Sequence, residues 1–174
     1  MKDARIAGAL YLTIAVCGGF SIGYVPSQIV VTGDAATTAA NLMGQLGLFR
    51  LGVFADSAVI LLEIAITVIL YQMFRTTSPR LALIAMVSRL GMIVVMAINL
   101  LLWVMPYVLL TQPMGLDPTD SQAFAQVFFE AHALGIYVWQ LFYGAQLLAL
   151  GWAILQSRLV PHLRGWGLFI GAFG

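Results

Sequence analysis

Six residues that can carry charge or move protons lie inside long apolar stretches of the sequence. They are the candidates for chemistry, and we call them the intramembrane polar cluster: Arg50, Asp56, Glu63, Arg89, Glu130 and His132. An ionisable side chain at the centre of a membrane helix costs about 2.5–3.5 kcal/mol on insertion scales, so each needs a partner, water or a change of protonation. Such residues often mark substrate or proton pathways, although intramembrane polar pairs also simply hold helices together.

Glu63 and Arg89 are expected to form an ion pair. At 1.5 Å per residue they lie about 16 Å and about 12 Å from the ends of two apolar stretches that the short polar segment 76–80 joins. A tight hairpin makes the two helices neighbours, so the two side chains should meet. Asp56 lies seven residues before Glu63 and therefore shares its helix face. A structural role for the pair is favoured over a catalytic one.

A second pair, Arg50 with Glu130, is expected near the opposite side of the membrane, with Asp56 and His132 nearby. Two alternatives remain open: Arg50 could snorkel to the surface, and His132 could transfer protons, which is the less favoured role. Further side chains that could line a polar cavity lie in the later apolar stretches: Met92, Met96, Asn99, Trp103, Trp139, Gln140, Tyr143 and Gln146.

No metal or cofactor site is predicted. His132 and His162 flank one apolar stretch at opposite ends, so they cannot ligate the same metal within the chain. The HExxH, CxxC and phosphate-binding glycine-loop motifs are absent. Cys17 lies in an apolar run and is expected to be inert. The sequence therefore favours a non-catalytic protein without a cofactor.

The composition places the chain in a membrane. Hydrophobic residues make up 61% of its 174 residues and charged residues only 9%, whereas soluble domains carry about a quarter charged residues. The basic residues form no stripe that could neutralise phosphates, so nucleic-acid binding is not supported. The expected surroundings are membrane lipids.

Four apolar segments are long enough to cross about 30 Å of hydrocarbon, which takes about 20 residues. They predict an all-α transmembrane bundle, a single domain over residues 1–174, with spans at about 6–25, 48–74, 81–110 and 122–156 and the start of a fifth at 165–174. The fifth segment reaches only about half-way across, so we expect a longer natural protein. Pro26 should end or kink the first span.

The loops contain two helix starts. Asp34 is expected to begin a modest helix at residues 35–46 near the membrane interface. Asp117 should cap the fourth span, with Pro118 as its first helical residue.

The basic residues predict the orientation. The loops at 32–47 and 111–121 contain no Lys or Arg but contain Asp34, Asp117 and Asp120. If the spans alternate, six basic residues fall on the opposite side: Lys2, Arg5, Arg75, Arg80, Arg158 and Arg164. The positive-inside rule then places the N-terminus in the cytoplasm.

Small residues recur every four positions at Ala15, Gly19 and Gly23, and again at Gly167 and Gly171. Such ridges let helices approach closely. They serve packing within a chain and association between chains equally well.

Several short strings along nearly the whole chain form a combination typical of one family. They are RIAGALYL at 5–12, GDAATTAAN at 33–41, LFRLG at 48–52 followed by Asp56, WQLFYG at 139–144, and LGW at 150–152 with Ser157 and Pro161. The sequence thus resembles the bacterial membrane proteins catalogued as domain of unknown function 4386. The resemblance implies a multi-pass protein of the bacterial cytoplasmic (inner) membrane with further helices, and it supplies no activity. Arg50 and Asp56 match its motif positions, whereas His132 lies outside them.

Three functions remain as hypotheses. The favoured one is a non-catalytic accessory or scaffold subunit that packs against another membrane protein or a second copy of itself. The alternative is a membrane enzyme or carrier that handles a lipophilic small molecule through the intramembrane polar cluster. A channel is least favoured, because one small bundle offers no obvious pore.

Overall fold

The structure, a computed structural model, describes residues 2–112 and 115–156. These residues form helices and turns and contain no strand. Four continuous helical stretches are long and apolar enough to cross a membrane: Asp3–Ile29, Leu46–Phe74, Pro79–Thr111 and Pro118–Gln156. The predicted all-α class is therefore confirmed. The predicted fifth span at 165–174, with Arg158, His162 and Arg164, lies outside the described residues.

The first span contains a π-helical segment. It consists of α1 (Lys2–Gly18), the π-helix η1 (Gly19–Tyr24) and α2 (Val25–Ile29). Pro26 has no backbone N–H and crowds the preceding turn, and wider π turns accommodate such interruptions of the helix ladder. The helix continues past Pro26, whose carbonyl accepts a hydrogen bond from the Val30 amide at 2.8 Å. The predicted end at residue 25 was therefore four residues too early.

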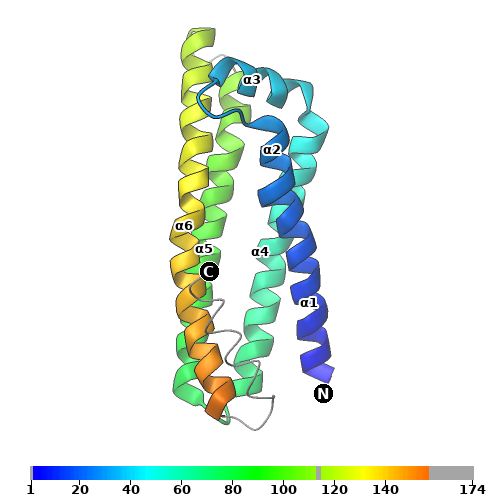
Figure 1. Ribbon diagram of the computed structural model, residues 1–174, viewed down its shortest axis with the longest axis vertical. Helices are drawn as coiled ribbons and strands as arrows, with labels where there is room; N and C mark the ends of the chain where they lie inside the picture. The colour runs from blue at the N-terminus through cyan, green and yellow to red at the C-terminus, as the bar shows by residue number, and fades with distance from the viewer. Residues whose placement is uncertain (1, 113–114, 157–174) are drawn as a thin grey trace. The chain divides into compact units, whose positions relative to one another are not determined.

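A capped turn leads into α3 (Ala35–Gly44). Gly33 adopts a φ of 78°, which glycine tolerates without a steric penalty. Asp34 then accepts hydrogen bonds from the backbone amide of Thr37 at 2.9 Å and from its hydroxyl at 2.7 Å. This confirms Asp34 as the helix start. Figure 1 shows α3 lying crosswise to α2.

Three long helices follow: α4 (Leu46–Phe74), α5 (Pro79–Thr111) and α6 (Pro118–Gln156), coloured from cyan to orange in Figure 1. A local sequence signal marks the start of α6. The Asp117 carboxylate accepts a hydrogen bond from the Thr119 amide at 2.7 Å, and Pro118 is the first residue of α6. The predicted cap is therefore confirmed.

The helices contribute to two compact units. Of the described residues, 2–12, 61–95 and 137–156 belong to unit 1, and 13–60, 96–112 and 115–136 belong to unit 2. The buried apolar core of unit 1 joins α4, α5 and α6 through Phe74, Ala82, Leu150, Ala153 and Ile154. The prediction of one domain over residues 1–174 stays a prediction.

The core of unit 2 is aromatic. The Trp103 ring of α5 lies 5.8 Å from the ring of Phe49 in α4 and 4.8 Å from that of Phe129 in α6, centroid to centroid. Val25, Ile29 and Leu42 complete the buried cluster. Outside the cores, large apolar side chains face outward: Phe54 and Leu141 are each 74% exposed. Lipid tails can cover such surfaces, as the composition leads us to expect.

Candidate functional site

A buried polar network surrounds Arg89 in unit 1. We call it the Arg89 network, and its members are Tyr11, Glu63, Thr67, Arg89 and Gln146. Arg89 is 1% exposed and forms an ion pair with Glu63. Its guanidinium also donates to Thr67 Oγ1 at 3.0 Å, to the Tyr11 hydroxyl at 3.0 Å and to Gln146 Oε1 at 3.2 Å. The predicted Glu63–Arg89 pair is thus present.

Helix geometry explains why these groups meet. Glu63 and Thr67 lie four residues apart on α4 and therefore on one face. The Thr67 hydroxyl donates to the Glu63 carbonyl at 2.6 Å, so its lone pairs face the guanidinium. The Tyr11 ring lies 5.5 Å from the central guanidinium carbon, close enough for a cation–π contact. Four helices, α1, α4, α5 and α6, thus contact a single cation.

The space beside the Arg89 network is too small for a substrate. A cavity of about 10 Å³ lies against Thr67, Tyr71, Arg89 and Gln146. A single water needs about 10–15 Å³ and several polar partners. The Gln146 amide nitrogen has no hydrogen-bond partner in the structure and could donate to one such water. The arrangement therefore holds the four helices together, and the cavity that the described residues leave beside Arg89 has room for about one water.

His132 is held between α5 and α6 of unit 2. Its Nδ1 lies 3.0 Å from the Asn99 carbonyl oxygen, and the Asn99 side-chain amide donates to the His132 carbonyl at 3.1 Å. Because a carbonyl oxygen only accepts, Nδ1 carries the hydrogen. The ring also packs 5.0 Å from Trp103, centroid to centroid. A side chain at Gly135 would collide with the Asn99 amide, so this glycine permits the close approach.

Asp56 of α4 is buried in unit 2 without a basic partner. Its carboxylate accepts a hydrogen bond from the Ser21 hydroxyl at 3.4 Å. Ser21 belongs to η1 and is itself buried. The π-helical segment thus presents a hydroxyl to the one acid that is buried in this unit.

The predicted Arg50–Glu130 pair is wrong. Glu130 is exposed and accepts a hydrogen bond from Gln126 Nε2 at 3.2 Å. Arg50 is also exposed, and within the described part of the chain the Glu63–Arg89 pair is the one salt bridge. Two residues at a similar depth in the membrane meet only if their helices are also rotated so that both side chains face each other. Glu130 and His132 are two residues apart, about 200° around the helix, so only one of them can face the core.

The six residues of the predicted polar cluster belong to two units, and the prediction that they form one cluster stays a prediction. Glu63 and Arg89 belong to unit 1, whereas Arg50, Asp56, Glu130 and His132 belong to unit 2. Among the further side chains predicted to line a cavity, Gln146 and Asn99 are buried in the contacts given above, and Gln140 is exposed. Residues 2–112 and 115–156 contain no group of three His, Cys, Asp or Glu that could hold a metal.

Sequence reasoning missed three partners: Tyr11, Thr67 and Ser21. The spacing of Thr67 from Glu63 is a usable signal, because a hydroxyl one turn from a buried acid shares its face. Tyr11 and Ser21 reach across to other helices, and their positions depend on helix rotation, which the sequence does not specify.

Four apolar helices that enclose buried polar contacts define a multi-pass helical membrane protein. The sequence model of the family Domain of unknown function (DUF4386) matches residues 6–174, and the chain belongs to this family. The match covers nearly the whole chain and confirms the resemblance. No curated protein and no solved structure gives a significant match.

Proposed function

We propose that this chain is a non-catalytic accessory subunit of the bacterial cytoplasmic membrane whose first span packs against a helix of another membrane protein. The single observation that carries the proposal is the open ridge of small residues at Ala15, Gly19 and Gly23. A Cβ atom placed at Gly19 or Gly23 would meet no other heavy atom within 4 Å.

Two glycines elsewhere in the chain show the packing that Gly19 and Gly23 lack. A Cβ at Gly52 would lie 3.0 Å from the Val25 side chain, and one at Gly91 would lie 2.9 Å from the Phe142 ring. Those glycines are already used for packing within the chain. The Gly19 and Gly23 positions are not, although small residues at this spacing favour close helix contact in lipid.

The first span is also the least covered. Only 11% of the most apolar window of Asp3–Ile29 is buried, against 28–39% for the other three spans. Because lipid tails are as apolar as leucine, burial alone does not drive helix association in a membrane. Close van der Waals packing does, and the Ala15–Gly19–Gly23 ridge offers the surface for it.

The absence of room around the buried charges supports a non-catalytic role. Four protein groups contact the Arg89 guanidinium, and the adjacent cavity of about 10 Å³ would hold at most one water. An enzyme or carrier that works through the intramembrane polar cluster would need an open path to these side chains. That alternative is therefore the weaker one.

The charge distribution supports the orientation in the membrane. Arg5, Arg75 and Arg80 are exposed and lie at the start of the first span or around the connection between the second and third spans, whereas Asp34 and Asp117 are exposed and lie in the other two connections. The positive-inside rule places the basic end, with the N-terminus, in the cytoplasm.

Site-specific photo-crosslinking in the native membrane tests the proposal. A photoreactive residue is placed at Gly19 or Gly23, with Phe54 as the control because it is 74% exposed and lies on another helix of unit 2. An adduct with one defined protein from positions 19 and 23, and none from 54, is the expected result. An adduct with a second copy of the chain would replace the proposal with self-association. Lipid adducts alone at all three positions would contradict both.

A further inference from the structure

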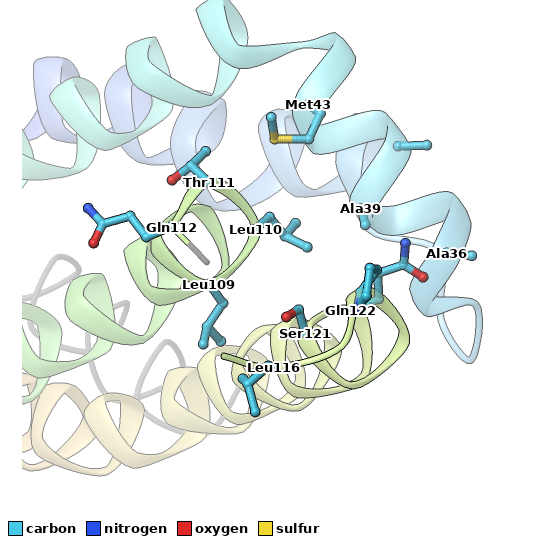
Figure 2. A pocket seen from close by; sticks show the side chains of 12 residues that line it. Ala36, Ala39, Met43, Leu109, Leu110, Thr111, Gln112, Leu116, Ser121 and Gln122 are labelled. Atoms are coloured by element: carbon cyan, nitrogen blue, oxygen red, sulfur yellow. The ribbon is translucent and has the colours of Figure 1, made fainter. Parts of the chain in front are cut away.

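A sizeable pocket lies within unit 2, where three segments meet. It has a volume of about 410 Å³ and is formed by α3, the C-terminal end of α5 and the beginning of α6 (Figure 2). Small-molecule sites in proteins range over roughly 300–1,000 Å³. The pocket is thus large enough for a ligand, unlike the space beside Arg89.

Small residues of α3 create the hollow. Ala36, Ala39, Ala40 and Met43 recur at spacings of three and four, so they share one helix face. Three of these four side chains are single methyl groups, which leave the space that larger side chains would fill. Leu109 and Leu110 of α5 and Leu116 add apolar walls. Figure 2 shows Leu109 and Leu116 close to each other on the side of the pocket away from α3.

Polar groups line another part of the same pocket. They are Thr111 and Gln112 at the end of α5 and Ser121 and Gln122 at the start of α6. In Figure 2 the Gln122 amide extends from α6 toward α3. The Thr111 hydroxyl donates to the Tyr107 carbonyl at 2.6 Å and keeps lone pairs to accept another bond. In the same view Thr111 and Gln112 lie on the side of α5 away from α6, whereas Ser121 and Gln122 lie beside the apolar walls. The pocket thus combines apolar walls with uncharged donors and acceptors at its edge.

The charges near the pocket disfavour an anion. No Lys or Arg lies at residues 32–47 or 111–121, which include the pocket-lining ends of α3, α5 and α6. Asp34, Asp117 and Asp120 lie in the same stretches and are exposed. Hydrogen bonds from the Thr37 amide and hydroxyl lower the pKa of Asp34, so this carboxylate is charged at neutral pH.

The pocket lies where apolar spans end. Thr111 is the last residue of α5, and Pro118 is the first residue of α6. The 33 residues of α5 make a helix about 50 Å long, so its ends reach beyond about 30 Å of hydrocarbon into the head-group region and the adjoining water. A molecule with a polar head and an apolar tail matches both the position of the pocket at the helix ends and its combination of polar and apolar lining residues.

We propose that the pocket of α3, α5 and α6 binds an amphiphile that has an alkyl tail and a hydrogen-bonding head without net negative charge. The tail lies on the Ala36–Met43 face of α3, and the head is held by Ser121 and Gln122 of α6. The amphiphile comes either from the surrounding bilayer or from outside the membrane. The proposal does not depend on the packing of the first span against a partner.

Photolabelling of the full chain in lipid nanodiscs tests the proposal. Three diazirine-tailed probes are compared: phosphatidylethanolamine, which is zwitterionic, monoacylglycerol, which is an uncharged free amphiphile, and phosphatidylglycerol, which is anionic. Adducts are mapped to peptides. We expect either of the first two probes to label residues 36–43 or 109–122 more strongly than the anionic probe does. The probe that labels identifies the source, a bilayer lipid or a free amphiphile.

Two variants and a matched control complete the experiment. Ala36→Phe fills the hollow and should abolish the labelling, whereas Ala123→Phe adds the same ring at an exposed position of α6 outside the pocket and should leave it unchanged. Gln122→Leu removes head-group hydrogen bonds and should reduce labelling about threefold to tenfold. Size-exclusion chromatography verifies that each variant is folded. Equal labelling by the anionic probe, no labelled peptide in the pocket, or equal effects of Ala36→Phe and Ala123→Phe would overturn the proposal.

Discussion

Removing either member of the Glu63–Arg89 pair should destabilise the protein strongly. In Arg89→Met, the Glu63 carboxylate stays buried without its counter-ion, and Tyr11, Thr67 and Gln146 lose their donor. Breaking a buried ion pair by removing one partner costs about 3–5 kcal/mol. Hydrogen bonds between membrane helices average only about 0.6 kcal/mol each. The unpaired charge should therefore account for most of the lost free energy of unfolding.

A double-mutant cycle measures this coupling. The free energy of unfolding of the wild type, Glu63→Gln, Arg89→Met and the double variant is obtained by denaturant titration in detergent micelles, with tryptophan fluorescence as the signal. We expect a coupling energy above about 2 kcal/mol, the upper end of the range for intramembrane hydrogen bonds alone. Arg50→Met is the control, because Arg50 is exposed and forms no salt bridge, and it should cost less than about 1 kcal/mol.

Additive effects of Glu63→Gln and Arg89→Met would refute the reasoning. So would losses no larger than that of Arg50→Met. Either result would mean that water or another group stabilises the charges in place of the pair.

Two further predictions concern local structure in unit 2. Hydrogen bonds from Thr37, chiefly from its amide, lower the pKa of Asp34 from its ordinary value of 3.8, so the cap stabilises α3 above that value and is lost as the pH falls through the lowered pKa. The hydrogen-exchange protection factors of α3, each taken against the intrinsic rate at the same pH, should therefore fall on acidification, but not in Asp34→Asn, whose cap does not titrate. Gly135→Ala should lower the free energy of unfolding by about 1–3 kcal/mol because its Cβ would collide with Asn99, whereas Gly18→Ala, which meets open space, should not destabilise; equal effects in the same titration would contradict the packing.

The spans and caps were predictable because their signals are local. Apolar length fixed the four spans to within a few residues at most ends, and Asp117 with Pro118 marked the start of α6 through cap chemistry. Pro26 indicated an irregularity in the first span. The form it takes, a π-helical segment that presents Ser21 to Asp56, depends on packing against α4.

The polar contacts were predictable only in part. Depth along the helix, together with the adjacency of two helices joined by a tight hairpin, was enough to predict the ion pair of Glu63 and Arg89. The same depth argument failed for Arg50 and Glu130, because it omits rotation about the helix axis. No sequence motif indicated the pocket, because it arises where the small alanine side chains of α3 leave space unfilled.

The most direct test of the account is the sidedness of the two ends of α5. Single cysteines replace Thr77, which precedes α5, and Thr119, which follows it, in a Cys17→Ser background, and both positions are exposed. A membrane-impermeant maleimide is then added to intact spheroplasts. Cysteine at position 119 should react at once, and cysteine at position 77 only after permeabilisation, because a single span separates them and the positive-inside rule predicts that the connection with Arg75 and Arg80 faces the cytoplasm. Labelling of both positions from the same side would contradict the account.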